Sequence, residues 1–358
     1  SLLIQAGIYV VRPIITYKSV ELGADATLVG LIGATFALAP LILAIQVGRF
    51  VDKGRSGLAL MLGSVILVLT TIALLFINSI ALLMLAMPSL GMGHLLIMVG
   101  GQTLIANRSS SSEYEKNFGL LTFYASAGHA IGPLVGGYLA DSGQVTVNAN
   151  AAFLFALALF VLAVIGTIAL STRKENPRPK QDLEKAKLRE VLAVPTFKSA
   201  MFVASATTAV VDVVLIFLPL YGREIGLSVT DIGILLAIRS IFSLAVRLVL
   251  GQISTKLGLR RLLSWGSIVT MVSMVALGLT ANFWLIALIM AISGFTMGVG
   301  QPATMAWVSR ISSPDSRGLA IAVRLSANRL GQVTMPALAG IVAGASTAGA
   351  VSYTHLRA

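Results

Sequence analysis

The sequence of 358 residues contains no cysteine and only three histidines. A disulfide framework, a thiolate nucleophile and a cysteine-bound metal are therefore excluded. The chain also lacks the phosphate-binding pattern GxxxxGK[ST] and the hydrolase patterns HExxH and GxSxG. We therefore expect no metal, no cofactor and no enzymatic activity, and we do not expect this chain to drive transport with ATP.

Charged residues are also scarce, at 11% of the chain, whereas soluble domains carry roughly a quarter. Hydrophobic residues make up 56%, and the mean hydropathy is +0.91. The formal net charge of +12 would suggest a nucleic-acid partner only if the basic residues formed a soluble patch. The composition instead predicts an all-α polytopic protein whose partner is the lipid bilayer.

Hydrophobic stretches of about 20 residues, enough to cross a bilayer, predict eleven membrane helices. We place them at residues 2–17, 26–47, 57–76, 81–106, 119–140, 148–170, 199–221, 232–250, 262–280, 283–308 and 318–343. One long polar stretch separates the sixth from the seventh. The predicted organisation is an N-terminal bundle (1–170), a linker (171–198) and a C-terminal bundle (199–344), followed by a tail (345–358) resembling translated cloning sequence.

The basic residues are distributed unevenly between the two sides of the predicted helices. Eighteen of the 26 Lys and Arg residues lie in loops after even-numbered helices or in the linker. Loops on the other side hold only Lys18 and Arg223. This positive-inside pattern predicts a cytoplasmic linker, and the compact loops suggest a bacterial inner membrane.

Residue patterns of the first half recur in the second half. Gly101-Gln102 recurs as Gly300-Gln301 and Gly132 as Gly331, at an offset of 199; Gly48 and Lys53 recur as Gly251 and Lys256, at an offset of 203. Such a near-constant offset predicts two homologous six-helix bundles in parallel orientation. By this repeat, the chain contains about eleven of twelve helices, with the first helix trimmed and the twelfth missing.

The stretch 128–137 reads GHAIGPLVGG, and its glycines lie four residues apart. Gly128, Gly132 and Gly136 form a bare stripe on a helix, which permits close packing of another backbone. Pro133 predicts a bend there, and Gly137 extends the small-residue surface. The run GxxxGPxxGG resembles the fifth-helix signature of the major facilitator superfamily, in particular its proton-coupled efflux branch.

The segment 48–55 reads GRFVDKGR and resembles the loop motif of that superfamily. Gly48 permits close helix packing, while Asp52 and Arg55 are charged groups suited to a cytoplasmic latch. The resemblance implies that this latch holds one state of the transport cycle and breaks in the other. The alternative interpretation is a positively charged turn with no role in gating.

Ionisable residues inside a membrane helix cost roughly 2.5–3.5 kcal/mol on insertion scales, so each is a functional candidate. Asp212 is the only acid in the middle of a predicted helix. It is our candidate proton carrier, with a structural ion pair to an arginine as the alternative. His94 and His129 could relay protons, or could form hydrogen bonds to neighbouring helices.

Five arginines also lie within predicted helices. We expect Arg12, Arg239 and Arg329 to face a central cavity and contact substrate, with Gln301 as a further polar candidate. Arg247 and Arg324 lie nearer the helix ends and could snorkel. Five arginines against one acid would favour an anionic or zwitterionic substrate.

These observations predict a monomeric secondary transporter that moves a small molecule by alternating access, with protons as the coupling ion, as the resemblance to efflux proteins implies. The first alternative is an organic-anion or metabolite transporter, by uniport or symport, with an arginine-lined cavity. The second is a membrane sensor or scaffold that transports nothing.

Overall fold

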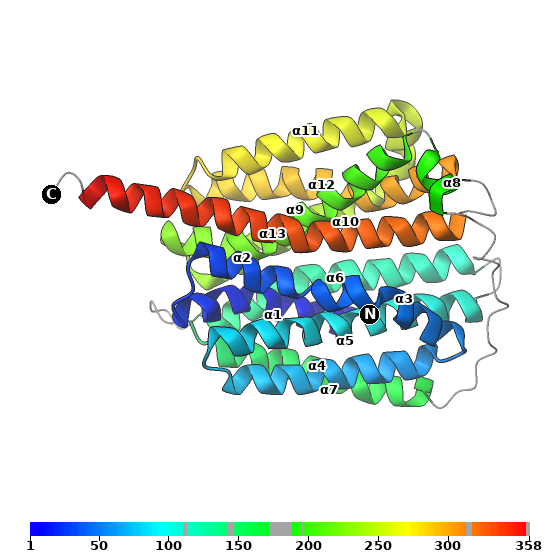
Figure 1. Cartoon of the computed structure of the whole chain (residues 1–358), viewed down its shortest axis with the longest axis horizontal. Helices are drawn as coiled ribbons and strands as arrows, with labels where there is room; N and C mark the ends of the chain where they lie inside the picture. Colours follow the sequence, from blue (N-terminus) through cyan, green and yellow to red (C-terminus); the bar gives the residue numbers. More distant parts are fainter. Residues whose placement is uncertain (110–112, 142–146, 172–187, 195, 313–316, 356–358) are drawn as a thin grey trace.

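The computed structural model describes residues 1–109, 113–141, 147–171, 188–194, 196–312 and 317–355. These ranges contain helices and no strand, and eight helices are long and apolar enough to cross a membrane by length and composition. The long helices run side by side in two groups, with α1–α7 below and α8–α13 above in Figure 1. We call these groups the N-bundle and the C-bundle.

The N-bundle follows the hydrophobic runs of the first half. Its helices are α1 (Leu2–Glu21), α2 (Ala26–Thr35), α3 (Leu38–Asp52), α4 (Ser56–Phe76), α5 (Ile80–Arg108), α6 (Tyr114–Ala140) and α7 (Ala149–Ser171). The side chain of Asp25 accepts a hydrogen bond from the Leu28 N–H at 2.8 Å and so caps α2. Val11, Leu67 and Phe153 are completely buried and join α1, α4 and α7 in one core.

The C-bundle has the same construction. Its helices are α8 (Leu188–Ala193), α9 (Phe197–Glu224), α10 (Val229–Leu257), α11 (Leu259–Leu277), α12 (Phe283–Ile311) and α13 (Arg317–His355). A capping box formed by Ser228 and Asp231 begins α10. Leu215, Leu236 and Met290 are completely buried and form the core that joins α9, α10 and α12.

The second predicted segment, 26–47, is broken into α2 and α3 around Phe36. Pro40 has no N–H to donate to the Phe36 carbonyl and crowds it, so a continuous helix is disfavoured at this point. The backbone carbonyl of Phe36 packs against Gly91 of α5. A Cβ added to Gly91 would collide with this oxygen. The predicted membrane segment at 26–47 is confirmed within the apolar stretch Ala26–Asp52, and the interruption of its helix at Phe36 is an addition that the sequence did not predict.

The internal repeat is visible in matching backbone contacts. A Cβ at Gly128 of α6 would stand 2.7 Å from the carbonyl oxygen of Leu2 in α1, and a Cβ at Gly331 of α13 would stand 2.9 Å from that of Ser205 in α9. Gly331 follows Gly128 by 203 residues, and Ser205 follows Leu2 by the same number. The contacts thus pair Gly331 with Gly128, one helical turn from the match to Gly132 that the sequence suggested.

The remaining predicted segments coincide with helices to within a few residues. α13 continues to His355, past the expected end at 343 and into the stretch expected to be a non-native tail. Most of the predicted linker lies outside the described residues, and α8 belongs to its last part. We call the side where α7 ends and α9 begins the linker side, and the opposite one the far side.

Candidate functional site

The two bundles approach each other closely at the far side. Gly137 of α6 faces the start of α10, where a Cβ would stand 2.7 Å from the Val229 carbonyl oxygen. An added Cβ at Gly233 would collide with the carbonyl oxygen of Pro133, which lies inside α6. Only glycine allows backbones to approach so closely, so α6 and α10 form a tight seam between the bundles.

A second seam of the same kind joins α2 and α13. A Cβ at Gly30 would collide with the Pro336 carbonyl oxygen, and one at Gly340 would stand 2.8 Å from the Ala26 carbonyl oxygen. The Thr27 hydroxyl also donates to the Gly340 carbonyl at 3.3 Å. Gly30, Pro336 and Gly340 correspond to Gly233, Pro133 and Gly137 at the offset of 203.

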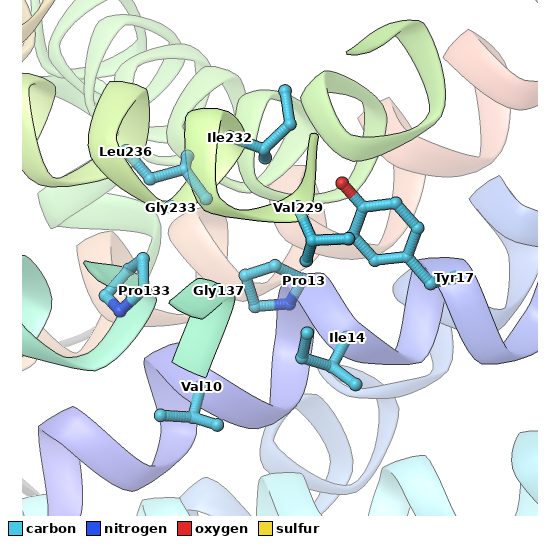
Figure 2. Close-up of a pocket in the computed structure, with 10 residues that line it drawn as sticks. All are labelled: Val10, Pro13, Ile14, Tyr17, Pro133, Gly137, Val229, Ile232, Gly233 and Leu236. Atoms are coloured by element: carbon cyan, nitrogen blue, oxygen red, sulfur yellow. The ribbon is translucent and has the colours of Figure 1, made fainter. Parts of the chain in front are cut away.

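Between α1, α6 and α10 the far side leaves almost no free space. Figure 2 shows a small cavity there, lined by Pro13 and Tyr17 of α1, Pro133 of α6 and Ile232 and Leu236 of α10, among others. Its volume is about 10 Å³, roughly the space of a single water. A small molecule in the centre of the protein therefore cannot leave by this route in the present state.

The residues of the predicted latch lie on the linker side. A Cβ built on Gly48 or on Gly119 would meet no atom within 4 Å. Asp52 is exposed and makes no ion pair with any residue that the structure describes. Arg55 is exposed too, and its guanidinium carbon lies 5.4 Å from the centre of the Phe50 ring. Neither charged residue of the predicted latch thus forms an ion pair with a residue that the structure describes.

Asp212 of α9 lies at the middle of the interface between the bundles. Its Oδ1 accepts a hydrogen bond from Nη1 of Arg12 in α1 at 2.8 Å, and both side chains are about 95% buried, with exposed fractions of 5% and 4%. The Arg12 guanidinium carbon also stands 4.5 Å from the Phe36 ring centre. The structure thus joins the predicted proton carrier and one predicted substrate contact in a buried ion pair that bridges the bundles.

Next to this pair, the Thr16 hydroxyl of α1 donates to the Ile216 carbonyl of α9 at 2.9 Å. Arg12 Nε and Nη2 are buried and have no hydrogen-bond partner among the described residues. Asp212 therefore bonds to only one of the three guanidinium nitrogens of Arg12.

Arg239 and Arg329, the other two predicted substrate contacts, lie on α10 and α13. Arg239 is 3% exposed; its Nη2 donates to the Ser240 hydroxyl at 3.3 Å, while its Nε has no partner among the described residues. Arg329 donates from Nη1 to Gln332 Oε1 at 2.8 Å. Neither of them is paired with a carboxylate in the described part of the chain.

The other candidates near this site form hydrogen bonds within or between the bundles. Gln301 of α12 donates to the Thr208 hydroxyl at 3.4 Å and lies exposed. Arg247 of α10, which the sequence suggested could snorkel, donates to the Ser126 hydroxyl of α6 at 3.0 Å and so crosses between the bundles. Arg324 is 2% exposed and donates to the hydroxyl of Thr304 and the carbonyl of Gln301, each at 2.9 Å from Nη2.

A polar cluster on the N-bundle wall was not predicted as a unit. The Oε1 of Gln5 in α1 lies 3.2 Å from Nε2 of His94 in α5 and 3.3 Å from Nε2 of His129 in α6. The His129 ring stacks on Tyr9, with 3.9 Å between centroids. Both histidines thus bond to a neighbouring helix, as the sequence allowed. Their convergence on one glutamine depends on α1 packing between α5 and α6.

The predicted glycine stripe of α6 packs inside the N-bundle, against α1. A Cβ at Gly132 would collide with the Ala6 carbonyl oxygen, and one at Gly136 would stand 2.9 Å from a methyl carbon of Val10. The stripe therefore fixes α6 to α1, whereas the neighbouring Gly137 faces the C-bundle.

A larger cavity of about 290 Å³ lies among α9, α11 and α12. Its lining includes Thr207, Leu263, Thr270 and Met274. By the internal repeat, α9 corresponds to α1 and α11 corresponds to α4. In the N-bundle, α7 packs on α1 and α4 and covers the equivalent surface. We therefore attribute this cavity to helix packing and not to the substrate path.

Two repeated helical bundles with ionisable groups between them, closed at one side, define a polytopic membrane transporter. The chain belongs to the Major Facilitator Superfamily, whose sequence profile matches residues 1–228 and 200–353. The family named from 128–137 and 48–55 is therefore confirmed.

Similar proteins include two bacterial resistance proteins. The chain is 26% identical over 349 residues to the quinolone resistance protein NorA of Staphylococcus aureus (strain MRSA252), covering 94% of this chain and 86% of NorA. It is 23% identical to multidrug resistance protein 1 of Bacillus subtilis (strain 168), with the same coverages.

The fold matches solved transporters as well. A bacterial homologue of the human lysosomal transporter Spinster, in an inward-facing and occupied conformation, superposes with a TM-score of 0.80 at 19% identity over 99% of this chain and 83% of that one. A D-xylose–proton symporter gives 0.72 at 16% identity, over 94% and 87%.

Proposed function

We propose that this protein is a secondary active transporter that exports a small molecule across the bacterial inner membrane, in exchange for protons, by alternating access. The observation that carries the proposal is the buried pair of Arg12 and Asp212 between the bundles. The charge distribution supports a cytoplasmic linker side. The state described above then opens to the cytoplasm and is closed at the far side.

Asp212 is the proposed proton carrier. As a carboxylate it accepts a charge-assisted hydrogen bond from Arg12, which ties α9 to α1. Protonation removes the negative charge and weakens this tie, so the bundles can separate at the far side. Breaking a buried ion pair by removing one partner costs about 3–5 kcal/mol, enough to shift a conformational equilibrium by two or more orders of magnitude.

Gly48, Asp52 and Arg55 are proposed to act in the opposite half of the cycle. When the linker side closes, Gly48 allows helices to approach and Asp52 finds cationic or helix-end partners that it lacks in the open state. The exposure of both charged side chains in the present state supports this role.

The test is transport in liposomes containing the purified chain, with an imposed pH gradient and a panel of lipophilic cations and organic anions. Internal pH and probe movement are followed together. We expect proton movement that depends on one class of probe. Asp212→Asn should abolish it, while Glu224→Gln, which neutralises an exposed acid on the same helix, should not.

The double variant Arg12→Gln/Asp212→Asn separates two explanations for a defect in Asp212→Asn. If the single substitution fails only because it leaves Arg12 buried and unpaired, the double variant should recover coupled transport. If Asp212 carries the proton, the double variant stays uncoupled although it folds. Coupled transport at the original rate in Asp212→Asn would reject the proposed role.

A further inference from the structure

The first turn of α10 is capped from both bundles. The first N–H groups of a helix have no partner within it, so each needs an acceptor from elsewhere. The Ser228 hydroxyl, from the residue that precedes α10, accepts from the Asp231 N–H at 3.0 Å. The Thr230 N–H donates instead to Oδ2 of Asp141, at 3.2 Å. Asp141 ends α6 of the N-bundle, so this part of the cap crosses between the bundles.

Asp141 lies on the face of α6 that forms the far-side seam. It follows Gly137 by four residues, about one helical turn. Its own N–H donates to the Gly137 carbonyl at 3.0 Å, and the Asn148 N–H donates to the Ala140 carbonyl at 2.8 Å. Figure 2 shows Gly137 beside Val229, the first residue of α10. The backbone of the N-bundle thus holds this carboxylate at the start of α10.

The charge of Asp141 matters at this position. A helix N-terminus carries a partial positive charge, and a hydrogen bond to a charged acceptor is stronger than one between neutral groups. In a state with the far side open, the end of α6 would lie away from α10 and water would replace the carboxylate at the Thr230 N–H. The contact therefore stabilises the closed state and not the open one.

The equivalent seam between α2 and α13 places its acid differently. Three positions of the α6 and α10 seam have counterparts at the offset of 203, namely Thr27 for Thr230, Asp25 for Ser228 and Gly344 for Asp141. Gly344 has no side chain, and a Cβ there would collide with the Thr27 hydroxyl oxygen. Asp25 caps its own helix, because it accepts from the Leu28 N–H of α2. The Asp25 contact thus lies within one bundle, whereas the Asp141 contact joins two.

We propose that Asp141 is a gate residue of the far side, whose carboxylate attracts α10 of the C-bundle to α6 of the N-bundle and favours the closed state. The inference rests on the alternating access proposed above and adds a residue that the sequence did not predict. Gly137 and Gly233 allow the two helices to approach, and Asp141 supplies an attraction between them.

The labelling rate of a buried thiol tests the proposal. The native chain has no cysteine, so Leu236→Cys places one thiol in the far-side cavity, where the native side chain is completely buried. A charged maleimide added to the purified protein in neutral detergent then labels this thiol in proportion to the open fraction. We expect Asp141→Asn, which keeps an acceptor but removes the charge, to raise the rate about fivefold, and Asp141→Ala to raise it about tenfold.

Asp25→Asn is the matched control. It removes the same charge from the first turn of the equivalent helix, and asparagine retains the cap. Because Asp25 and α2 belong to one bundle, the labelling rate should stay within about twofold of the parent. An exposed thiol, Leu279→Cys, should react at the same rate in every background.

The double variant Asp141→Gly/Ser228→Asp copies the α2 and α13 seam into the α6 and α10 seam. It gives α10 an acid on its own N-cap, so the helix stays capped, but it removes the attraction between the bundles. We expect faster labelling, as in Asp141→Asn, with a Tm within about 2 °C of the parent. This variant decides the question even if the single substitutions lower the stability of the protein.

Unchanged labelling in the Asp141 variants would overturn the proposal, as would an equal rise in Asp25→Asn. A fall in Tm without faster labelling would also overturn it, since Asp141 would then act as a helix cap and not as a gate. The measurement needs neither substrate nor a pH gradient. Faster labelling of Asp141→Asn in a protein without Asp212-dependent proton movement would keep the gate and reject the coupling. Unchanged labelling in a protein with such movement would reject the gate and keep the transport function.

Discussion

Two faces of α6 use glycine for different purposes. Gly132 and its stripe pack on α1 of the same bundle, while Gly137 packs on α10 of the other bundle. Five residues at about 100° each turn the helix by about 140° beyond a full circle, so the two positions face different neighbours. In alternating access the first contact persists throughout the cycle, whereas the second must open. Close glycine packing by itself does not tell a permanent contact from a temporary one.

The largest effect is expected for Gly132→Leu. Its side chain would be forced into the Ala6 carbonyl in a contact that no state of the cycle relieves. Overpacking of this kind costs about 1–3 kcal/mol or more. We expect the apparent Tm of the purified protein to fall by about 5 °C or more, with loss of transport. Gly119→Leu, on the same helix in open space, is the control; equal stability of the two variants would contradict the comparison.

A smaller effect on stability and a large one on transport are expected for Gly137→Leu. The new side chain collides with α10 only when the far side is closed, so the protein can avoid the clash by opening there. Transport should fall about tenfold or more, while Tm changes by less than about 2 °C.

Accessibility shows whether Gly137→Leu acts by opening the far side. The native chain has no cysteine, so Leu236→Cys introduces a single thiol into the far-side cavity. In the Gly137→Leu background a membrane-impermeant maleimide should label it faster than in the parent. A Tm loss as large as that of Gly132→Leu, with unchanged labelling, would remove the distinction between the two faces.

The smallest effect is expected for Tyr17→Phe. The Tyr17 hydroxyl lies at the far-side cavity and is buried with no hydrogen-bond partner in the described structure. Removing an unsatisfied polar group leaves the ring in place and should be neutral or slightly stabilising. We expect transport within about twofold of the parent and no loss of Tm. A strong transport defect would show that the hydroxyl acts in a state other than the closed one.

The fold could be predicted from the sequence because the length and hydrophobicity of each run determine a membrane helix directly. The break at Phe36 was missed although Pro40 was visible, since proline also occurs inside the continuous helices α1, α5 and α6. Whether a proline bends or interrupts a helix depends on what receives the freed carbonyl. Here Gly91, more than 50 residues away in sequence, leaves room for that carbonyl because it has no side chain.

The site could be predicted only as a set of separate residues. Asp212 and Arg12 were visible as charges inside apolar runs, but their pairing depends on α1 and α9 meeting between the bundles. The contact of both His94 and His129 with Gln5 was harder to predict, since Gln5 is one neutral polar residue among many. Residue type indicated which side chains could carry charge or form hydrogen bonds, whereas the packing of α1 determines which of them contact one another.

The two seams at the far side have a consequence for how that side opens. Gly30 and Gly340 repeat the geometry of Gly233 and Gly137, so the bundles contact each other closely at two equivalent seams. Opening one seam alone would tilt the bundles about the other seam and strain the contacts of both seams. We therefore expect the far side to open in a single all-or-none step, with no half-open state that would leak protons.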